Sequence, residues 1–189
     1  MKCRQILSLI FVTFLLCFTV VGCTTKQSFK DTTDLYTVTK NKDNTYSYSL
    51  ADLKGNFLFE KENVVREPKI NAVSTNVYEL ITQTGTGLST NWAVYCDVEK
   101  GKKSEIFQYV LMAQGDYVIY ANYENDEHSV IVQNIFDKSD YYKKHILANC
   151  SPIAGDVVIK AESKGEGSAV VTYLTGNDYN EAELAINFP

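Results

Sequence analysis

The sequence predicts an all-β fold built from an antiparallel meander, and three observations lead to this prediction. Several runs alternate apolar and polar side chains with a period of two residues, which is the pattern of a half-buried strand. Tyr accounts for 13 of the 189 residues and Met for only 2, and aromatic and β-branched residues suit a pleated sheet surface. Clusters of Gly, Asn and Asp separate the runs, as hairpin turns do.

The alternating runs are expected to form strands throughout the body of the chain. In chain order they are 46–50 (YSYSL), 92–97 (WAVYCD), 117–121 (YVIYA), 129–132 (SVIV) and 169–174 (AVVTYL). In the second run, Trp92, Val94 and Cys96 share one face of the predicted strand. A helical turn is compatible with the sequence only at 138–148, where two adjacent tyrosines disfavour it.

The predicted turns recur at a regular spacing. Strand–turn–strand units centre near Asp52, Asp97, Asp137 and Asp178, at intervals of 45, 40 and 41 residues. Such a period is typical of propeller blades, each of which is one antiparallel meander. Meanders of short strands in a β-sandwich give similar intervals, and four units are few for a closed propeller. The sequence therefore predicts a single domain at residues 35–189 that forms a β-sandwich or a small propeller-like arrangement.

Composition and charge exclude several classes of protein. The chain has 18 basic and 23 acidic residues and a formal net charge of −5. Nucleic-acid-binding domains normally carry a basic surface, so no nucleic-acid partner is expected. The hydrophobic share of 45 % is enough for a folded core and excludes a disordered chain.

The first residues have the pattern of an export signal. Lys2 and Arg4 precede Ile6–Val21, a run of sixteen residues that is almost wholly apolar. A membrane-spanning helix needs about 20 apolar residues, whereas the apolar region of a secretory signal peptide is shorter. Residues 1–22 are therefore predicted to be a signal peptide that is not part of the fold.

The tetrapeptide Val20-Val21-Gly22-Cys23 resembles the lipobox of bacterial lipoproteins. The resemblance implies cleavage before Cys23, which then carries a diacylglycerol and acyl chains such as palmitate. Residues 23–34 become a lipidated tether, and the protein is held on the extracytoplasmic face of the cell membrane. An ordinary secreted protein and an uncleaved membrane anchor are the alternatives.

Cleavage would also change the charge of the protein. The mature chain retains 16 basic and 23 acidic residues, which gives a net charge of −7. Anionic headgroups repel such a body, so the lipid itself has to anchor it.

Three segments of the body are similar to segments of uncharacterised small lipoproteins of Gram-positive bacteria. They are 85–92 (GTGLSTNW), 134–142 (NIFDKSDYY) and 172–179 (TYLTGNDY). The similarity extends over most of residues 60–189. That group has no assigned activity, so the resemblance implies no catalytic residue here.

The segment GTGLSTNW is the candidate ligand-binding site. Its glycines allow unusual backbone conformations, its polar side chains offer hydroxyls and an amide, and its tryptophan offers an aromatic face to a sugar ring or a peptide. The candidate residues are Gly85, Gly87, Ser89, Thr90, Asn91 and Trp92. In the alternative interpretation this segment is a tight turn, and Trp92 is buried in the core.

The remaining reactive side chains give weak signals. Cys96 and Cys150 either form a disulfide outside the cytoplasm or remain free thiols. His128 and His145 are the only histidines, and no HExxH or CxxC motif indicates zinc. No catalytic residue, metal or cofactor is therefore predicted.

These observations together predict an exported, lipid-anchored, non-enzymatic binding module at the cell surface. Its partner is expected to be a peptide, a glycan or another envelope protein. The alternative is a surface hydrolase that acts on a glycan or a peptide, with Ser89 and a histidine in a triad, because triads are defined by geometry rather than by sequence order.

Overall fold

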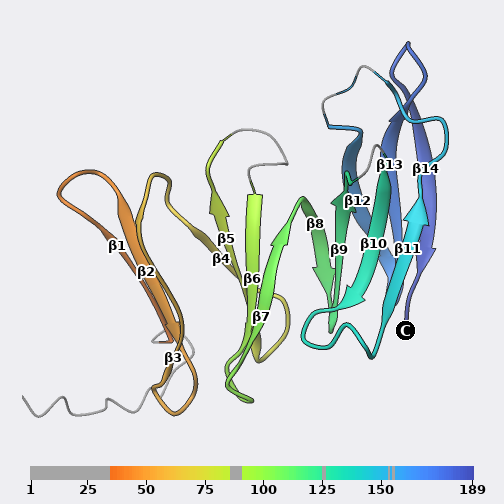
Figure 1. Ribbon diagram of the computed structural model, residues 1–189. Helices are drawn as coiled ribbons and strands as arrows, with labels where there is room; N and C mark the ends of the chain where they lie inside the picture. Colours follow the sequence, from red (N-terminus) through yellow and green to blue (C-terminus); the bar gives the residue numbers. More distant parts are fainter. Residues whose placement is uncertain (1–34, 86–90, 125–126, 153, 155) are drawn as a thin grey trace, which may run out of the picture.

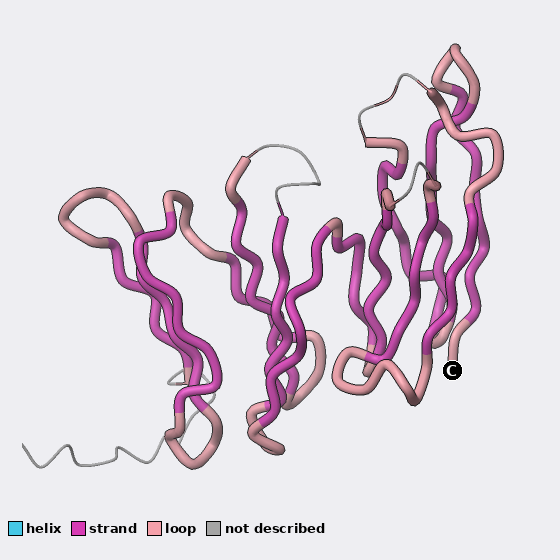
Figure 2. Tube along the Cα trace, viewed as in Figure 1, coloured by secondary structure: helices cyan, strands magenta, loops and turns pink. Residues whose placement is uncertain are grey.

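The computed structural model describes residues 35–85, 91–124, 127–152, 154 and 156–189. Within these residues the regular secondary structure consists of strands (Figure 2), and the predicted all-β class is confirmed. The described residues contain no helix long and apolar enough to cross a membrane. The segment 138–148 contains a strand, Tyr142–Ile146, in place of a helical turn.

The described strands form four antiparallel sheets that follow one another along the chain. Sheet 1 has the order β1 (Tyr36–Lys40), β2 (Tyr46–Ala51), β3 (Phe57–Val64). Sheet 2 has the order β4 (Lys69–Ala72), β5 (Val77–Gln83), β6 (Asn91–Asp97), β7 (Lys102–Gln108). Sheet 3 has the order β11 (Tyr142–Ile146), β10 (Ser129–Asn134), β9 (Tyr117–Asn122), β8 (Val110–Gln114). Sheet 4 has the order β12 (Val158–Gly165), β13 (Ser168–Thr175), β14 (Asn180–Asn187).

The predicted turn spacing corresponds to a repeated feature of these sheets. Each predicted centre lies at the connection between the last two strands of its sheet. Asp52 follows β2, Asp97 ends β6, Asp137 follows β10 and Asp178 follows β13. The regular interval along the sequence therefore reflects four successive meanders of similar length.

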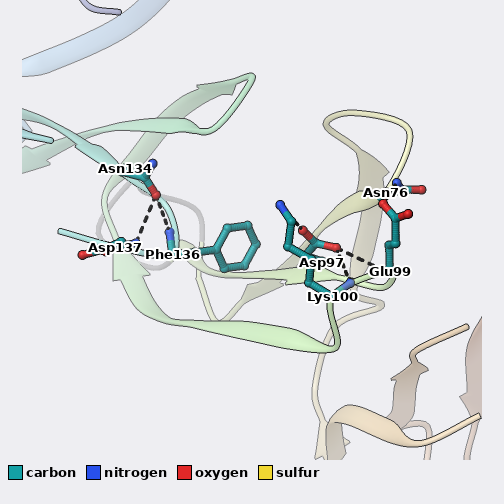
Figure 3. Close-up of polar contacts among 7 residues, drawn as sticks. All are labelled: Asn76, Asp97, Glu99, Lys100, Asn134, Phe136 and Asp137. Atoms are coloured by element: carbon teal, nitrogen blue, oxygen red, sulfur yellow. Dashed lines mark hydrogen bonds and ion pairs between the residues drawn. The ribbon is translucent and has the colours of Figure 1, made fainter. Parts of the chain in front are cut away.

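Side-chain oxygens close these turns in the same way in sheets 2 and 3 (Figure 3). Oδ1 of Asp97 accepts the backbone N–H groups of Glu99 at 3.1 Å and Lys100 at 2.9 Å. Oδ1 of Asn134 accepts the N–H of Phe136 at 2.9 Å and that of the next residue at 3.0 Å. Asp and Asn favour such positions because their short side chains bond to the backbone two residues on.

The four sheets stand side by side in a row, from sheet 1 in orange to sheet 4 in blue (Figure 1). Three apolar clusters fill the spaces between sheets 1 and 2, 2 and 3, and 3 and 4. Residue pairs from the three clusters are Leu50 and Leu80, Tyr95 and Val118, and Val132 and Val171, each at most 1 % exposed. Neighbouring sheets thus pack face to face as in a sandwich, and their serial order is that of propeller blades.

The outer faces of the two end sheets are polar. On sheet 1, Thr37 pairs with Ser49 and Thr39 with Ser47, on the face opposite to the buried Leu50. On sheet 4, the exposed side chains of Lys160 and Glu183 lie on either side of Thr172, a polar residue that is itself only 4 % exposed. Repeat architectures need such polar outer faces at their ends, so both ends of the row are compatible with contact with water.

Candidate functional site

A cleft of about 470 Å³ lies between sheets 2 and 3. It runs along β7, which is the edge strand of sheet 2, and its other wall is formed by β9 and the residues after it. The lining residues are Trp92, Glu105, Ile106, Phe107, Gln108, Tyr109, Tyr120, Ala121, Asn122, Tyr123, Glu124 and Lys138. The volume is in the range of about 300–1,000 Å³ that is typical of small-molecule sites.

Trp92 lines this cleft from the start of β6, and its cross-strand partner on β7, Gln108, lines it too. Val94 and Cys96, two and four residues further on, are buried between sheets 1 and 2, as their shared face predicts. Trp92 is 38 % exposed and belongs to none of the three apolar clusters. The structure therefore favours the interpretation in which Trp92 is accessible over the one in which it is a core residue.

A buried amide fixes a carboxylate at the wall of the cleft. Gln133 on β10 is 1 % exposed, and its Nε2 donates a hydrogen bond to Oε1 of Glu105 at 2.9 Å. Its Oε1 accepts a hydrogen bond from the hydroxyl of Tyr120 at 2.8 Å. Burial, more than the nearby carboxylates, raises the pKa of Tyr120, so its hydroxyl remains a donor at neutral pH. The Glu105 carboxylate is thus oriented before any ligand arrives.

Aromatic contacts stiffen the same wall. The rings of Phe107 and Tyr120 lie 5.5 Å apart across sheets 2 and 3. Tyr109 and Tyr123 form an edge-to-face pair with ring centroids 4.9 Å apart. Burial raises the pKa of Tyr123 to about 12, and its hydroxyl accepts the N–H of Val158 at 3.3 Å. The cleft is therefore connected to sheet 4 as well as to sheets 2 and 3.

The charges and side-chain types of the cleft suit binding. Two carboxylates, Glu105 and Glu124, and one ammonium, Lys138, line it. The Lys138 ammonium lies 4.2 Å from the centre of the Tyr142 ring, a cation–π distance. Among the described lining residues there is no Ser, Thr, Cys or His. Aromatic faces, an oriented carboxylate and amides are groups that hold sugars and peptides.

The described residues of the predicted segment GTGLSTNW have different environments in the structure. Gly85 lies just after β5, and its carbonyl accepts a hydrogen bond from Nη1 of Arg66 at 2.7 Å. Asn91 begins β6, and its Oδ1 is buried and makes no hydrogen bond in the described part of the chain. Trp92 lines the cleft. Gly87, Ser89 and Thr90 lie outside the described residues.

The two body cysteines are free thiols in different parts of the fold. Cys96 is buried between sheets 1 and 2, and burial raises the pKa of its thiol to about 12. Cys150 packs against the cluster between sheets 3 and 4 and forms an isolated bridge with Thr175. Of the two interpretations of these cysteines, the structure has the free thiols and not the disulfide.

The histidines are not assembled with Cys96. His145 lies on β11, opposite Val130 of the core between sheets 3 and 4, and burial lowers the pKa of its imidazole. His128 contacts the ring of Tyr123 at 5.5 Å between centroids. Within the described residues, no group of three or more His, Cys, Asp and Glu side chains is placed to hold a metal ion.

Sequence reasoning missed Glu105, Gln133 and Tyr120 as parts of the site. The only signal was Gln133 itself, a polar residue that directly follows the apolar run Val130–Val132. Glu105 and Gln133 are 28 positions apart in the sequence, and they meet only when sheets 2 and 3 stack.

Comparison of the chain with protein-family models, with curated proteins and with solved structures gave no match.

Proposed function

We propose that this protein is an exported binding module, anchored through lipid on Cys23 to the extracytoplasmic face of the cell membrane. The support for export and anchoring is the order of features at the start of the sequence: a basic start, an apolar run, and Val20-Val21-Gly22-Cys23. The acyl chains would supply the attachment, since two chains hold a protein stably on a bilayer and one does so only marginally.

The observation that supports binding best is the cleft between sheets 2 and 3. A partly exposed Trp92 stands at its border, and Gln133 holds the Glu105 carboxylate at its wall. A ring that stacks and a carboxylate that accepts hydrogen bonds together suit a segment of a glycan or a peptide. The partner is therefore proposed to be a peptide, a glycan or an envelope protein that presents one of these.

Ligand binding is testable by fluorescence, because Trp92 is the single tryptophan of the chain. Titration of the protein with a panel of envelope glycans and peptides should change the Trp92 emission for at least one ligand class. The Glu105→Gln variant should bind that ligand about tenfold or more weakly, since a charge-assisted hydrogen bond contributes about 1.5–3 kcal/mol. Glu181→Gln, on sheet 4 and away from the cleft, is the matched control. If neither the glycans nor the peptides of the panel change the Trp92 emission, binding at this cleft is refuted.

A surface hydrolase is the second candidate, and one observation favours it: Glu105 and Glu124 line the same cleft. A pair of carboxylates is the usual machinery of glycoside hydrolysis. Incubation of the ligand with the protein and mass analysis of the products separates the two candidates. Cleavage that both Glu105→Gln and Glu124→Gln abolish supports the hydrolase, whereas an intact ligand supports the binding module.

The anchor is testable independently of the cleft. Cys23→Ala should leave the chain unprocessed or release it from membranes, and mass spectrometry of the wild-type protein should find acyl chains on Cys23. An unmodified amino terminus on the wild-type protein would refute the proposed lipidation.

A further inference from the structure

The chain enters the folded domain at one end of sheet 1. Leu35, the first described residue, is 2 % exposed, and its carbonyl accepts the N–H of Ala51 at 2.8 Å. Tyr36 begins β1 opposite Leu50, which is the penultimate residue of β2. The point of entry therefore lies beside the turn that connects β2 to β3.

This same end exposes apolar side chains. Leu53 in the turn is 44 % exposed, and Phe57, the first residue of β3, is 70 % exposed. Tyr36 beside them is 38 % exposed. Lys54 is also exposed at the tip of the turn. The combination of apolar and basic side chains is typical of surfaces that lie at a membrane interface.

Hydrogen bonds hold the turn between β2 and β3 in a conformation that leaves its apolar side chains exposed. Oδ1 of Asp52 accepts the N–H groups of Lys54 at 2.9 Å and Asn56 at 2.8 Å, and Oδ2 accepts the Asn56 amide at 2.9 Å. The N–H of Leu53 donates to the carbonyl of Val98 in sheet 2 at 3.0 Å. Both the shape of the turn and its position against sheet 2 are thus fixed by hydrogen bonds.

We propose that this end of sheet 1 docks on the lipid bilayer, with Leu53 and Phe57 inserted between the headgroups and Lys54 facing the phosphates. This inference rests on the proposed lipidation of Cys23. Twelve residues, 23–34, separate the proposed lipid from the folded domain, and a chain of twelve residues spans at most about 40 Å. The end at which the chain enters the domain therefore lies within that distance of the anchor. The exposed side chains at this end of sheet 1 include those of Tyr36, Leu53 and Phe57.

Charge supports this orientation. The mature chain would carry a net charge of −7, so most of its surface is repelled by an anionic bilayer. The turn places Lys54 at its tip, and its own acidic residue, Asp52, is 7 % exposed with both oxygens occupied by hydrogen bonds. This end of the protein is therefore a place where contact with anionic headgroups is tolerated.

The test measures how deeply a tryptophan lies in the membrane when it is placed at either end of β3. In a Trp92→Phe background, Phe57→Trp places the only tryptophan at the proposed contact. Val65→Trp is the matched control, because Val65 follows β3 at its other end, about 26 Å away, and is even more exposed at 80 %. The lipidated mature chains are purified from membranes and reconstituted in vesicles of phosphatidylcholine and phosphatidylglycerol, with and without lipids brominated on the acyl chain.

We expect the emission of the tryptophan at position 57 to shift to shorter wavelength and to be quenched by brominated lipid. The emission of the tryptophan at position 65 should be unchanged. Equal responses at the two positions, in chains whose mass shows lipid on Cys23, would overturn the docking alone. A chain whose mass lacks the lipid would overturn both the docking and the proposed anchoring. Far-UV circular dichroism identical to that of the wild type shows that either substitution leaves the fold intact.

Discussion

Gln133 of sheet 3 donates a hydrogen bond of 2.9 Å to the carboxylate of Glu105 in sheet 2, across the boundary between the two sheets. The donor is buried and the acceptor is on the exposed edge strand β7. The bond therefore connects the interior of the stack to the wall of the cleft, and a change at Gln133 should affect both stability and binding.

The first prediction concerns this amide. Gln133→Leu keeps the shape of the side chain but leaves the Tyr120 hydroxyl and the Glu105 carboxylate without their partner. We expect a loss of about 1–3 kcal/mol in the free energy of unfolding, measured with urea. Gln114→Leu is the control, because its Nε2 bonds to the Gly165 carbonyl in an exposed position and should cost much less. Equal losses in the two variants would contradict the importance of the buried bond.

The second prediction concerns the turn between β12 and β13. Gly167 has a φ of +66°, and a Cβ atom there would lie 2.6 Å from the carbonyl oxygen of Phe188, which is backbone. Gly115 has a similar φ of +58°, but a Cβ atom there would meet nothing within 4 Å. Gly115→Ala should cost about 1 kcal/mol of stability from the left-handed backbone alone. Gly167→Ala should cost clearly more in thermal and urea unfolding, and similar costs would show that the contact with Phe188 relaxes freely.

The third prediction concerns acid stability. Burial tends to raise the pKa of Asp97, but the backbone hydrogen bond and the ammonium of Lys100 outweigh it and leave the pKa below its ordinary value. A carboxylate with a lowered pKa in the folded state stabilises the protein above the pKa of the unfolded state. That contribution is lost as the pH falls through the folded value, which means below about pH 4.

The Asp97→Asn variant isolates this contribution, because the amide oxygen still accepts the two backbone N–H groups. We expect it to be about 1 kcal/mol less stable at neutral pH, since the Lys100 ammonium is well exposed and screened by water. Its stability should also fall less than that of the wild type on acidification. Urea unfolding at a series of pH values measures both effects, with the exposed Asp178→Asn as control. Parallel curves for Asp97→Asn and the wild type would contradict the prediction.

The fourth prediction concerns the thiols. Cys96 is 0 % exposed and its pKa is raised to about 12, so almost no thiolate is present near pH 8. Iodoacetamide should modify the half-buried Cys150 of the native protein first, and Cys96 only after unfolding. Because both thiols are free, reduction should leave the mass of the chain unchanged. A mass increase on reduction would show a disulfide.

The sequence predicts the interior of each sheet better than its edges. The five alternating runs correspond to β2, β6, β9, β10 and β13, and each of these has a neighbouring strand on both sides. Of the strands that the pattern does not reveal, most lie at sheet edges, such as β11 (YKKHI), whose side chains are largely exposed. The exception is β5, an interior strand of sheet 2 that is buried on both faces and therefore does not alternate. Without burial there is no selection for alternation, and the pattern is lost.

The cleft could be predicted only in part, because its components are separated along the chain. The segment that ends in Trp92 has a local signature, with glycines and polar side chains before an aromatic residue. Glu105 has no such signature in the polar run around it, and its role depends on Gln133 of another sheet. Pairs such as Glu105 and Gln133 form because the sheets stack on one another. The periodicity of a single strand carries no information about which sheets stack.

The serial order of the sheets has a consequence for how the protein reaches its native state. Each apolar cluster joins only consecutive sheets, so no part of the core waits for a distant segment. A polypeptide that leaves a ribosome or a translocation channel with its amino end first can complete the contact between sheets 1 and 2 while sheet 4 is still inside. Vectorial assembly of this kind keeps the exposed intermediates short-lived, and it would let the chain mature progressively as it emerges.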